Sequence, residues 1–212
     1  GGAIILSSLV GGLVVFLWLL GIMFTTKISD GLDGLATGIV LIGSMMIFFL
    51  TRAGKFYQPN VAVLSLIFAA VCLGFLIFNF PSASIFLGES GSLFIGFILG
   101  VLAIISGSKL AIAFLVIFVP ALDVARVAYS RYRAGLSIFR GDRRHLHYRM
   151  IDYGFSVRMV VFIFYLLAAV FGALGLLLQS GQKAVVLLIA IIAMLIVSYK
   201  LPETENSHEK QK

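Results

Sequence analysis

The feature that most restricts the fold of this chain is a series of long apolar runs separated by short polar stretches. Each run approaches the roughly 20 residues that an α-helix needs to cross a bilayer core of about 30 Å. Since 61% of the residues are hydrophobic and 12% are charged, a soluble domain is excluded. The sequence therefore predicts an all-α, polytopic integral membrane helix bundle with about seven transmembrane helices. They cover residues 3–24, 35–51, 61–79, 92–107, 109–129, 158–179 and 184–200.

The two ends of the chain differ in character. It opens at Gly1-Gly2, without Met or a signal-peptide pattern, so we expect the C-terminal part of a longer protein whose upstream helices are missing. Residues 1–201 are expected to form one transmembrane domain, and the charged residues 202–212 a disordered cytoplasmic tail. Cys72, the only cysteine, lies in an apolar run, which predicts a packing role and no intrachain disulfide.

The polar loops alternate between the two sides of the membrane. With seven spans, the loops at 26–34, 80–91 and 130–157 share one side. The third of these loops contains six arginines, whereas the connectors of the opposite side contain Arg52, Lys55, Lys109 and Lys183. The positive-inside rule places the three loops in the cytoplasm. Any single arginine is also explained as a determinant of topology that binds anionic lipid.

The first of these loops carries two carboxylates and two glycines between apolar runs, in the stretch from Lys27 to Leu35. An ionised Asp costs roughly 3 kcal/mol at the centre of a membrane helix, so Asp30 and Asp33 are expected at the membrane surface or in a watered cleft. If the segment is helical, the two residues share a face. Glycine lets a phosphate approach the backbone closely, which favours a nucleotide site. The alternative is a polar connector in which Asp caps the next helix.

The other two loops add residues of matching chemistry. The second contains Glu89, ten residues after Asn79, and the third contains His145 and His147 among arginines. Carboxylates from separate loops suit Mg²⁺, which binds one or two carboxylates together with substrate phosphate. Guanidinium groups match phosphate oxygens. A zinc site is disfavoured, because the two histidines lack ligands at the usual spacing.

Each of these residues also has a structural explanation. Glu89 complements the dipole at the N-terminus of the fourth span. For His145 and His147, the structural explanation is that they are polar residues at the membrane interface. Asp123 and Arg126 are three residues apart, so we expect them to pair on one helix.

Four motifs in order resemble a known family. They are residues 29–38, 79–96, 120–123 and 141–147, preceded by the Trp-Leu-Leu-Gly stretch that begins at Trp18. Together they are similar to the polyprenyl-phosphate N-acetylhexosamine-1-phosphate transferases of glycosyltransferase family 4, over about residues 13–157. The sequence before and within the His-Leu-His motif is closer to the N-acetylglucosamine branch than to the muramoyl-pentapeptide branch.

The resemblance implies a reaction and its partners. A polyprenyl phosphate such as undecaprenyl phosphate attacks the β-phosphorus of a UDP-N-acetylhexosamine, and UMP leaves. Mg²⁺ is the implied cofactor, with Mn²⁺ as a substitute, and residues 1–201 become a catalytic domain in the cell membrane with its site on the cytoplasmic face. The bilayer is a partner, nucleic acid is not expected, and a homodimer is left open.

The resemblance also assigns roles by position. Catalytic residues are expected at Asp30, Asp33, Glu89, His145 and His147. Substrate binding is expected at Lys27, Asn79, Arg143 and Arg144. Glu89 and Asp30 are the expected metal ligands.

Three positions depart from the family's pattern. Lys27 stands where Asn is usual, Glu89 where Asp is usual, and Tyr148 where a further histidine is common. The family's paired-aspartate motif lies upstream of these helices, so this chain alone is expected to be inactive. The rival interpretations are the muramoyl-pentapeptide transferase and a silent relative that binds lipid or nucleotide. A transporter is disfavoured, because the ionisable residues gather in loops on one face.

Overall fold

The computed structural model describes residues 8–52, 57–107, 110–137, 144–178 and 180–200, and every regular element in these ranges is helical. Five helices are long and apolar enough to cross a membrane, and α5 and α6 together form a sixth candidate. The chain is therefore a multi-pass membrane protein, as predicted. The helices are α1 (Ser8–Ser29), α2 (Leu35–Arg52), α3 (Pro59–Asn79), α4 (Gly88–Ile105), α5 (Leu110–Val116), α6 (Phe118–Arg133), α7 (Leu146–Asp152), α8 (Val157–Leu177) and α9 (Ser180–Lys200).

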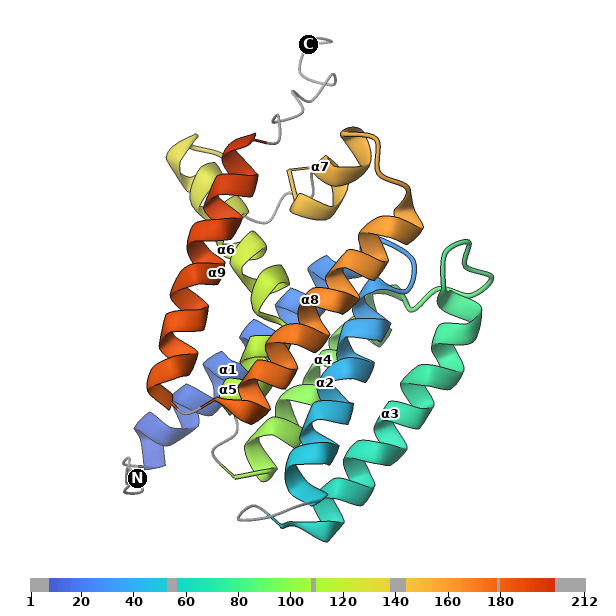
Figure 1. Cartoon of the computed structure of the whole chain (residues 1–212), viewed down its shortest axis with the longest axis vertical. Helices are drawn as coiled ribbons and strands as arrows, with labels where there is room; N and C mark the ends of the chain where they lie inside the picture. Colours follow the sequence, from blue (N-terminus) through green and yellow to red (C-terminus); the bar gives the residue numbers. More distant parts are fainter. Residues whose placement is uncertain (1–7, 53–56, 108–109, 138–143, 179, 201–212) are drawn as a thin grey trace.

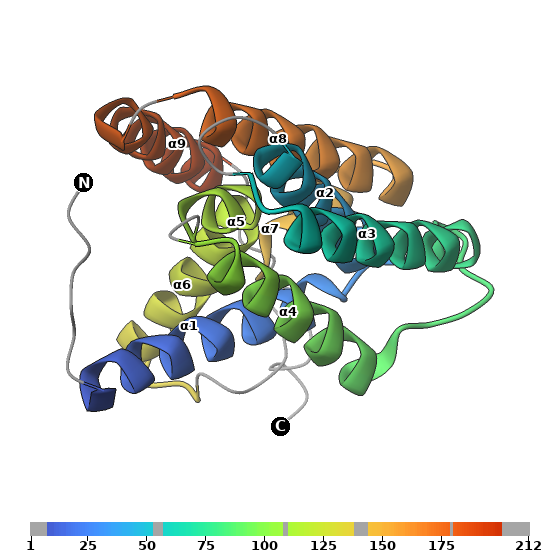
Figure 2. The same cartoon turned by 90° about the horizontal axis from the view of Figure 1, so that it is seen from below.

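Helix α2 is the centre of the bundle. It packs against α3, α8, α4 and α5, and it is the most buried of the candidate spans. Viewed from below, α8 and α9 lie on one side, α1 lies on the other, and α2 and α5 lie between them (Figure 2). The buried apolar side chains of α2, such as Ile39, Val40 and Ile47, form the middle of the core. Apolar side chains on the outside of α1 and α3 stay exposed, which suits contact with lipid.

The fifth predicted span, residues 109–129, is not one straight helix. It breaks at Ile117 into α5 and α6, whose axes differ by 71°. Pro120 explains the break, because it has no N–H to donate to the carbonyl of Val116 and its ring crowds that carbonyl. The seventh predicted span, residues 184–200, lies within α9. The other predicted spans agree with helices within a few residues, except that α1 continues to Ser29 and so includes Lys27.

Two glycines allow close helix contacts that position the polar loops. A Cβ atom on Gly38 would lie 2.0 Å from the ring of Tyr165, and the Tyr165 hydroxyl donates a 2.6 Å hydrogen bond to the carbonyl of Gly34. A Cβ on Gly96 would lie 2.1 Å from Thr26 Oγ1, where α4 crosses α1. The first contact holds the turn that precedes α2 against helix α8. The second brings the start of α4 next to the end of α1. Cys72 is buried in α3, which confirms its packing role.

Candidate active site at one end of the bundle

The three polar loops lie together, as the sequence predicted. The α1–α2 turn, the α3–α4 loop and α7 gather at one end of the bundle (Figure 1). Asn79, at the end of α3, joins the first two loops. Its Oδ1 accepts hydrogen bonds from Gly34 N and Thr37 Oγ1, both at 3.1 Å, and its Nδ2 donates to the carbonyl of Ile85 at 3.0 Å. Asn79 is 2% exposed, so its amide acts as an internal clamp between the loops.

The two aspartates of the first loop do not share a helix face, because residues 30–34 form turns. Asp33 Oδ2 accepts a 3.1 Å hydrogen bond from Ala83 N, so this carboxylate helps to hold the α3–α4 loop. Burial, together with the negative charge of Asp33, raises the pKa of Asp30 to about 6. Asp30 is thus the carboxylate whose negative charge is poorly compensated.

Lys27 and Glu89, two of the residues that depart from the family's pattern, contact each other. The Lys27 ammonium of α1 forms an ion pair with Glu89 Oε1, in the first turn of α4. The Lys27 and Glu89 side chains are 37% and 68% exposed, so the pair is open to solvent. Lys27 Nζ also lies 5.9 Å from the ring centroid of Phe24, one turn earlier on α1. The place of Glu89 in the first turn agrees equally with the helix-dipole explanation.

The histidine side of the site is organised by Asp123. The expected pairing with Arg126 is present, at 3.1 Å between Arg126 Nη2 and Asp123 Oδ1. Asp123 Oδ2 also lies 2.9 Å from His145 Nδ1 and accepts a 2.9 Å hydrogen bond from Leu146 N. The predicted helical pair therefore also holds the start of α7, and this contact was missed because it joins positions 22 residues apart.

The second histidine lies against the first loop. His147 is 3% exposed, its ring stacks on that of His145 at 5.7 Å between centroids, and its Nε2 has no partner among the described residues. Burial lowers the pKa of His147 to about 4, so its ring is neutral near pH 7. The Tyr148 hydroxyl donates to the carbonyl of Gly31 at 3.0 Å. A Cβ on Gly31 would lie 2.9 Å from His147 Nε2, so His147 approaches the residue next to Asp30.

The predicted site residues thus fall into two groups, and the members of each group contact one another. Lys27 and Glu89 form one group at the α1–α4 contact, while His147 and Tyr148 adjoin the turn that carries Asp30. Two further loop residues were predicted to bind substrate. Arg144 accepts a 2.5 Å hydrogen bond from Arg126 through its carbonyl, and Arg143 lies outside the described residues.

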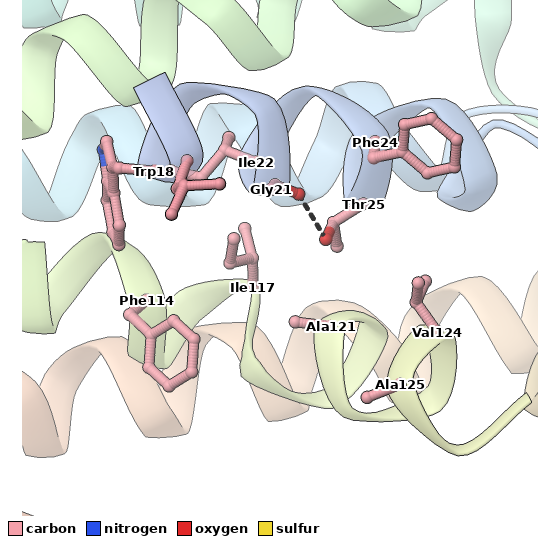
Figure 3. Close-up of a pocket in the computed structure, with 11 residues that line it drawn as sticks. Trp18, Gly21, Ile22, Phe24, Thr25, Phe114, Ile117, Ala121, Val124 and Ala125 are labelled. Atoms are coloured by element: carbon pink, nitrogen blue, oxygen red, sulfur yellow. Dashed lines mark hydrogen bonds between the residues drawn. The ribbon is translucent and has the colours of Figure 1, made fainter. Parts of the chain in front are cut away.

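An apolar pocket of about 360 Å³ lies between α1 and the bent α5–α6 pair (Figure 3). Trp18 lines one end and Phe24 the other, and Ile117 lines it at the bend. Phe24 is also the ring that lies near the Lys27 ammonium. The Phe24 end of the apolar pocket therefore lies near the Lys27–Glu89 ion pair.

Comparisons with known proteins agree with this chemistry. The family model described as "Glycosyl transferase family 4" matches residues 1–107. The "Decaprenyl-phosphate N-acetylglucosaminephosphotransferase" of Mycolicibacterium smegmatis is 35% identical, over 93% of this chain and 55% of the relative. The "Probable undecaprenyl-phosphate N-acetylglucosaminyl 1-phosphate transferase" of Bacillus subtilis is 32% identical, over 92% of this chain and 56% of the relative. The "Phospho-N-acetylmuramoyl-pentapeptide-transferase" of Staphylococcus aureus is 32% identical, over 77% and 50%. The chain spans about half the length of these relatives.

Proposed function

Because the chain belongs to glycosyl transferase family 4, we propose that the intact protein transfers N-acetylglucosamine-1-phosphate from UDP-N-acetylglucosamine to a polyprenyl phosphate such as undecaprenyl phosphate. UMP is released, and the polyprenyl-diphosphate sugar starts a cell-envelope polysaccharide. The names of the Mycolicibacterium smegmatis and Bacillus subtilis relatives support the transferred group and the polyprenyl-phosphate acceptor. The proposal places the site on the cytoplasmic face of the cell membrane, in line with the arginines of the third loop.

The observation that carries the proposal is the meeting of an apolar pocket and polar loops at one end of the bundle. The pocket between α1 and α5–α6 would hold the part of the lipid chain nearest the phosphate. Its Phe24 end leads to Lys27, whose ammonium would bind that phosphate in exchange for Glu89. The turn with Asp30 and the buried His147 lies at the same end of the bundle, where the sugar nucleotide would bind.

Magnesium remains part of the proposal. When bound, Mg²⁺ would neutralise charge on the diphosphate of the sugar nucleotide. Asp30 fits this ion, because burial and Asp33 raise its pKa and a cation would relieve that charge. Glu89 fits it less well, because its carboxylate already binds Lys27. The described residues contain no group of three His, Cys, Asp or Glu side chains able to hold a metal ion, so further ligands would come from substrate or from other parts of the intact protein.

The muramoyl-pentapeptide transfer is the second candidate, favoured by the similarity to the Staphylococcus aureus enzyme. One experiment separates the two. The intact protein in detergent, with undecaprenyl phosphate and Mg²⁺, is given either UDP-N-acetylglucosamine or UDP-N-acetylmuramoyl-pentapeptide, and UMP release is followed. We expect release with UDP-N-acetylglucosamine only. Absence of release with both donors, from a folded preparation, would reject the proposed function.

Two variants test the residues. In the intact protein, Asp30→Ala and Glu89→Ala are each expected to abolish UMP release, since each removes a carboxylate from the proposed site. The matched control is Asp152→Asn, which removes an exposed carboxylate on α7. Near-normal release by Asp30→Ala would remove that residue from the site. The half-length chain itself is predicted to release no UMP.

A further inference from the structure

Asp123 is a buried carboxylate whose two oxygens are both occupied. It lies on α6 and is 3% exposed. Its Oδ1 accepts from Nε and Nη2 of Arg126, at 3.3 and 3.1 Å. Its Oδ2 accepts from Leu146 N at 2.9 Å and lies 2.9 Å from Nδ1 of His145. Arg126 also donates to the carbonyl of Arg144 at 2.5 Å, so it holds both Asp123 and the residue before His145.

These contacts determine which nitrogen of His145 carries hydrogen. An ionised carboxylate has acceptor atoms only, and the adjacent guanidinium and backbone N–H favour the ionised form of Asp123. The hydrogen between Asp123 and His145 therefore sits on Nδ1. In a neutral imidazole only one nitrogen carries hydrogen, so Nε2 keeps its lone pair. Histidine in water prefers the opposite tautomer, and the protein thus selects the less common one.

We propose that Asp123 is a positioning residue that holds His145 in the Nδ1–H tautomer, so that Nε2 accepts a hydrogen bond from a hydroxyl or amide N–H of the bound sugar nucleotide. This inference rests on the proposed function and deepens it. His145 is suitably placed, because its ring stacks on His147, which in turn reaches the turn containing Asp30. The backbone bond from Leu146 to the same Asp123 oxygen fixes the position of the ring as well as its proton.

The tautomer is tested directly by nitrogen NMR on the intact wild-type protein labelled at histidine. The resonances of His145 are assigned by their loss in His145→Gln. We expect a protonated Nδ1 and an unprotonated Nε2 near pH 7. A hydrogen on Nε2, either with a bare Nδ1 or in a doubly protonated ring, would overturn the proposal. This readout does not depend on activity, so it tests the tautomer held by Asp123 even if the wild-type protein releases no UMP and the proposed function fails.

A double-mutant cycle separates positioning from a general structural role. In the intact protein, Asp123→Asn is expected to lower kcat for UMP release by about 10- to 100-fold, the usual cost of removing such an orienting partner. KM for the sugar nucleotide is expected to rise as well, because the hydrogen bond that Nε2 accepts is made by the bound substrate. In the His145→Gln background, Asp123→Asn should cause no further loss, because it acts through the ring that is already absent.

The control is again Asp152→Asn, an Asp-to-Asn change on the helix that follows His145. It is expected to keep wild-type kcat. Independent, multiplicative losses from Asp123→Asn and His145→Gln would overturn the proposal, and so would an equal loss in the Asp152 variant. If Asp123→Asn fails to fold, as judged by circular dichroism, the tautomer measured in the wild-type protein decides alone.

Discussion

Lys27 and Glu89 replace the Asn and Asp that the resembled family usually carries, and in this chain the two side chains bind each other. A carboxylate with a longer reach meets an ammonium from the neighbouring helix, so the two departures are physically complementary. The sequence identified both positions, but it could not pair them. The close packing of α4 on α1, at Gly96 among other positions, brings these side chains together across 62 residues of sequence.

This pair is predicted to matter for activity far more than for stability. An exposed ion pair contributes about 0–1 kcal/mol to folding. In the intact protein, Lys27→Met and Glu89→Gln should therefore shift the thermal midpoint by only a few degrees, whereas UMP release should fall at least about tenfold. Thermal melting and the UMP assay on the same samples test this. A loss of activity that follows the loss of folded protein would contradict it.

Asp30 gives a prediction about pH with a definite sign. Its folded-state pKa of about 6 lies above the ordinary Asp value of 3.8, so the folded state binds the proton more tightly than the unfolded state. The stability contributed by the protonated carboxyl is present below about pH 4 and is lost as the pH rises through 6. In metal-free buffer, the thermal midpoint of Asp30→Asn relative to wild type should rise between pH 4 and 6 and then level off. A difference that does not vary with pH would contradict the burial of Asp30.

At the scale of elements, apolar periodicity predicted where helices exist but not how they meet. In the sequence, only Pro120 indicated a break in the fifth span. The 71° angle between α5 and α6 could not be predicted, because the two helices pack against α8 and α1 in the folded protein. Likewise, Gly38 ends the motif at residues 29–38, but the sequence does not reveal what packs against it. Its importance depends on Tyr165, which comes 127 residues later and covers the glycine with its ring.

The contact between α2 and α8 can be tested with a matched pair of glycine variants. In Gly38→Ala, the new methyl group would displace the ring of Tyr165 and break its hydrogen bond to Gly34. We expect a destabilisation of about 1–3 kcal/mol, seen as a lower thermal midpoint. Gly74→Ala on α3 is the control, because no atom lies within 4 Å of its new methyl group, and it should be neutral or slightly stabilising. Equal effects would contradict the close contact.

At the scale of the whole molecule, counting spans correctly predicted that the three polar loops lie at one end. The break in the fifth span does not change the number of membrane crossings, because α5 and α6 together still connect the two ends of the bundle (Figure 1). The contacts inside the site did not follow from that count. The sequence predicted Asp123 and Arg126 as a pair, but the link to His145 requires the fold of the intervening chain.

The orientation of the bundle can be tested with single cysteines, because Cys72 is the only cysteine among these 212 residues. In a Cys72→Ser background, Tyr57→Cys and Tyr153→Cys place thiols at opposite ends, at residues of similar exposure, 66% and 63%. A membrane-impermeant maleimide on spheroplasts should label position 57 at once and position 153 only after permeabilisation. The reverse pattern would place the three polar loops outside the cell.

The clamp made by Asn79 has a consequence for biogenesis. Its partners Thr37 and Gly34 are made 42 and 45 residues earlier, so the aspartate turn can be locked as soon as α3 has been synthesised. His147 follows 68 residues after Asn79, which at 5–20 residues per second is a delay of roughly 3 to 14 s. We expect the turn that contains Asp30 and Asp33 to fold during synthesis, before the segment that contains His147 has been made. A nascent chain halted once all of α3 has left the ribosome, but before His147 is made, would then already protect the amide of Gly34 from hydrogen exchange.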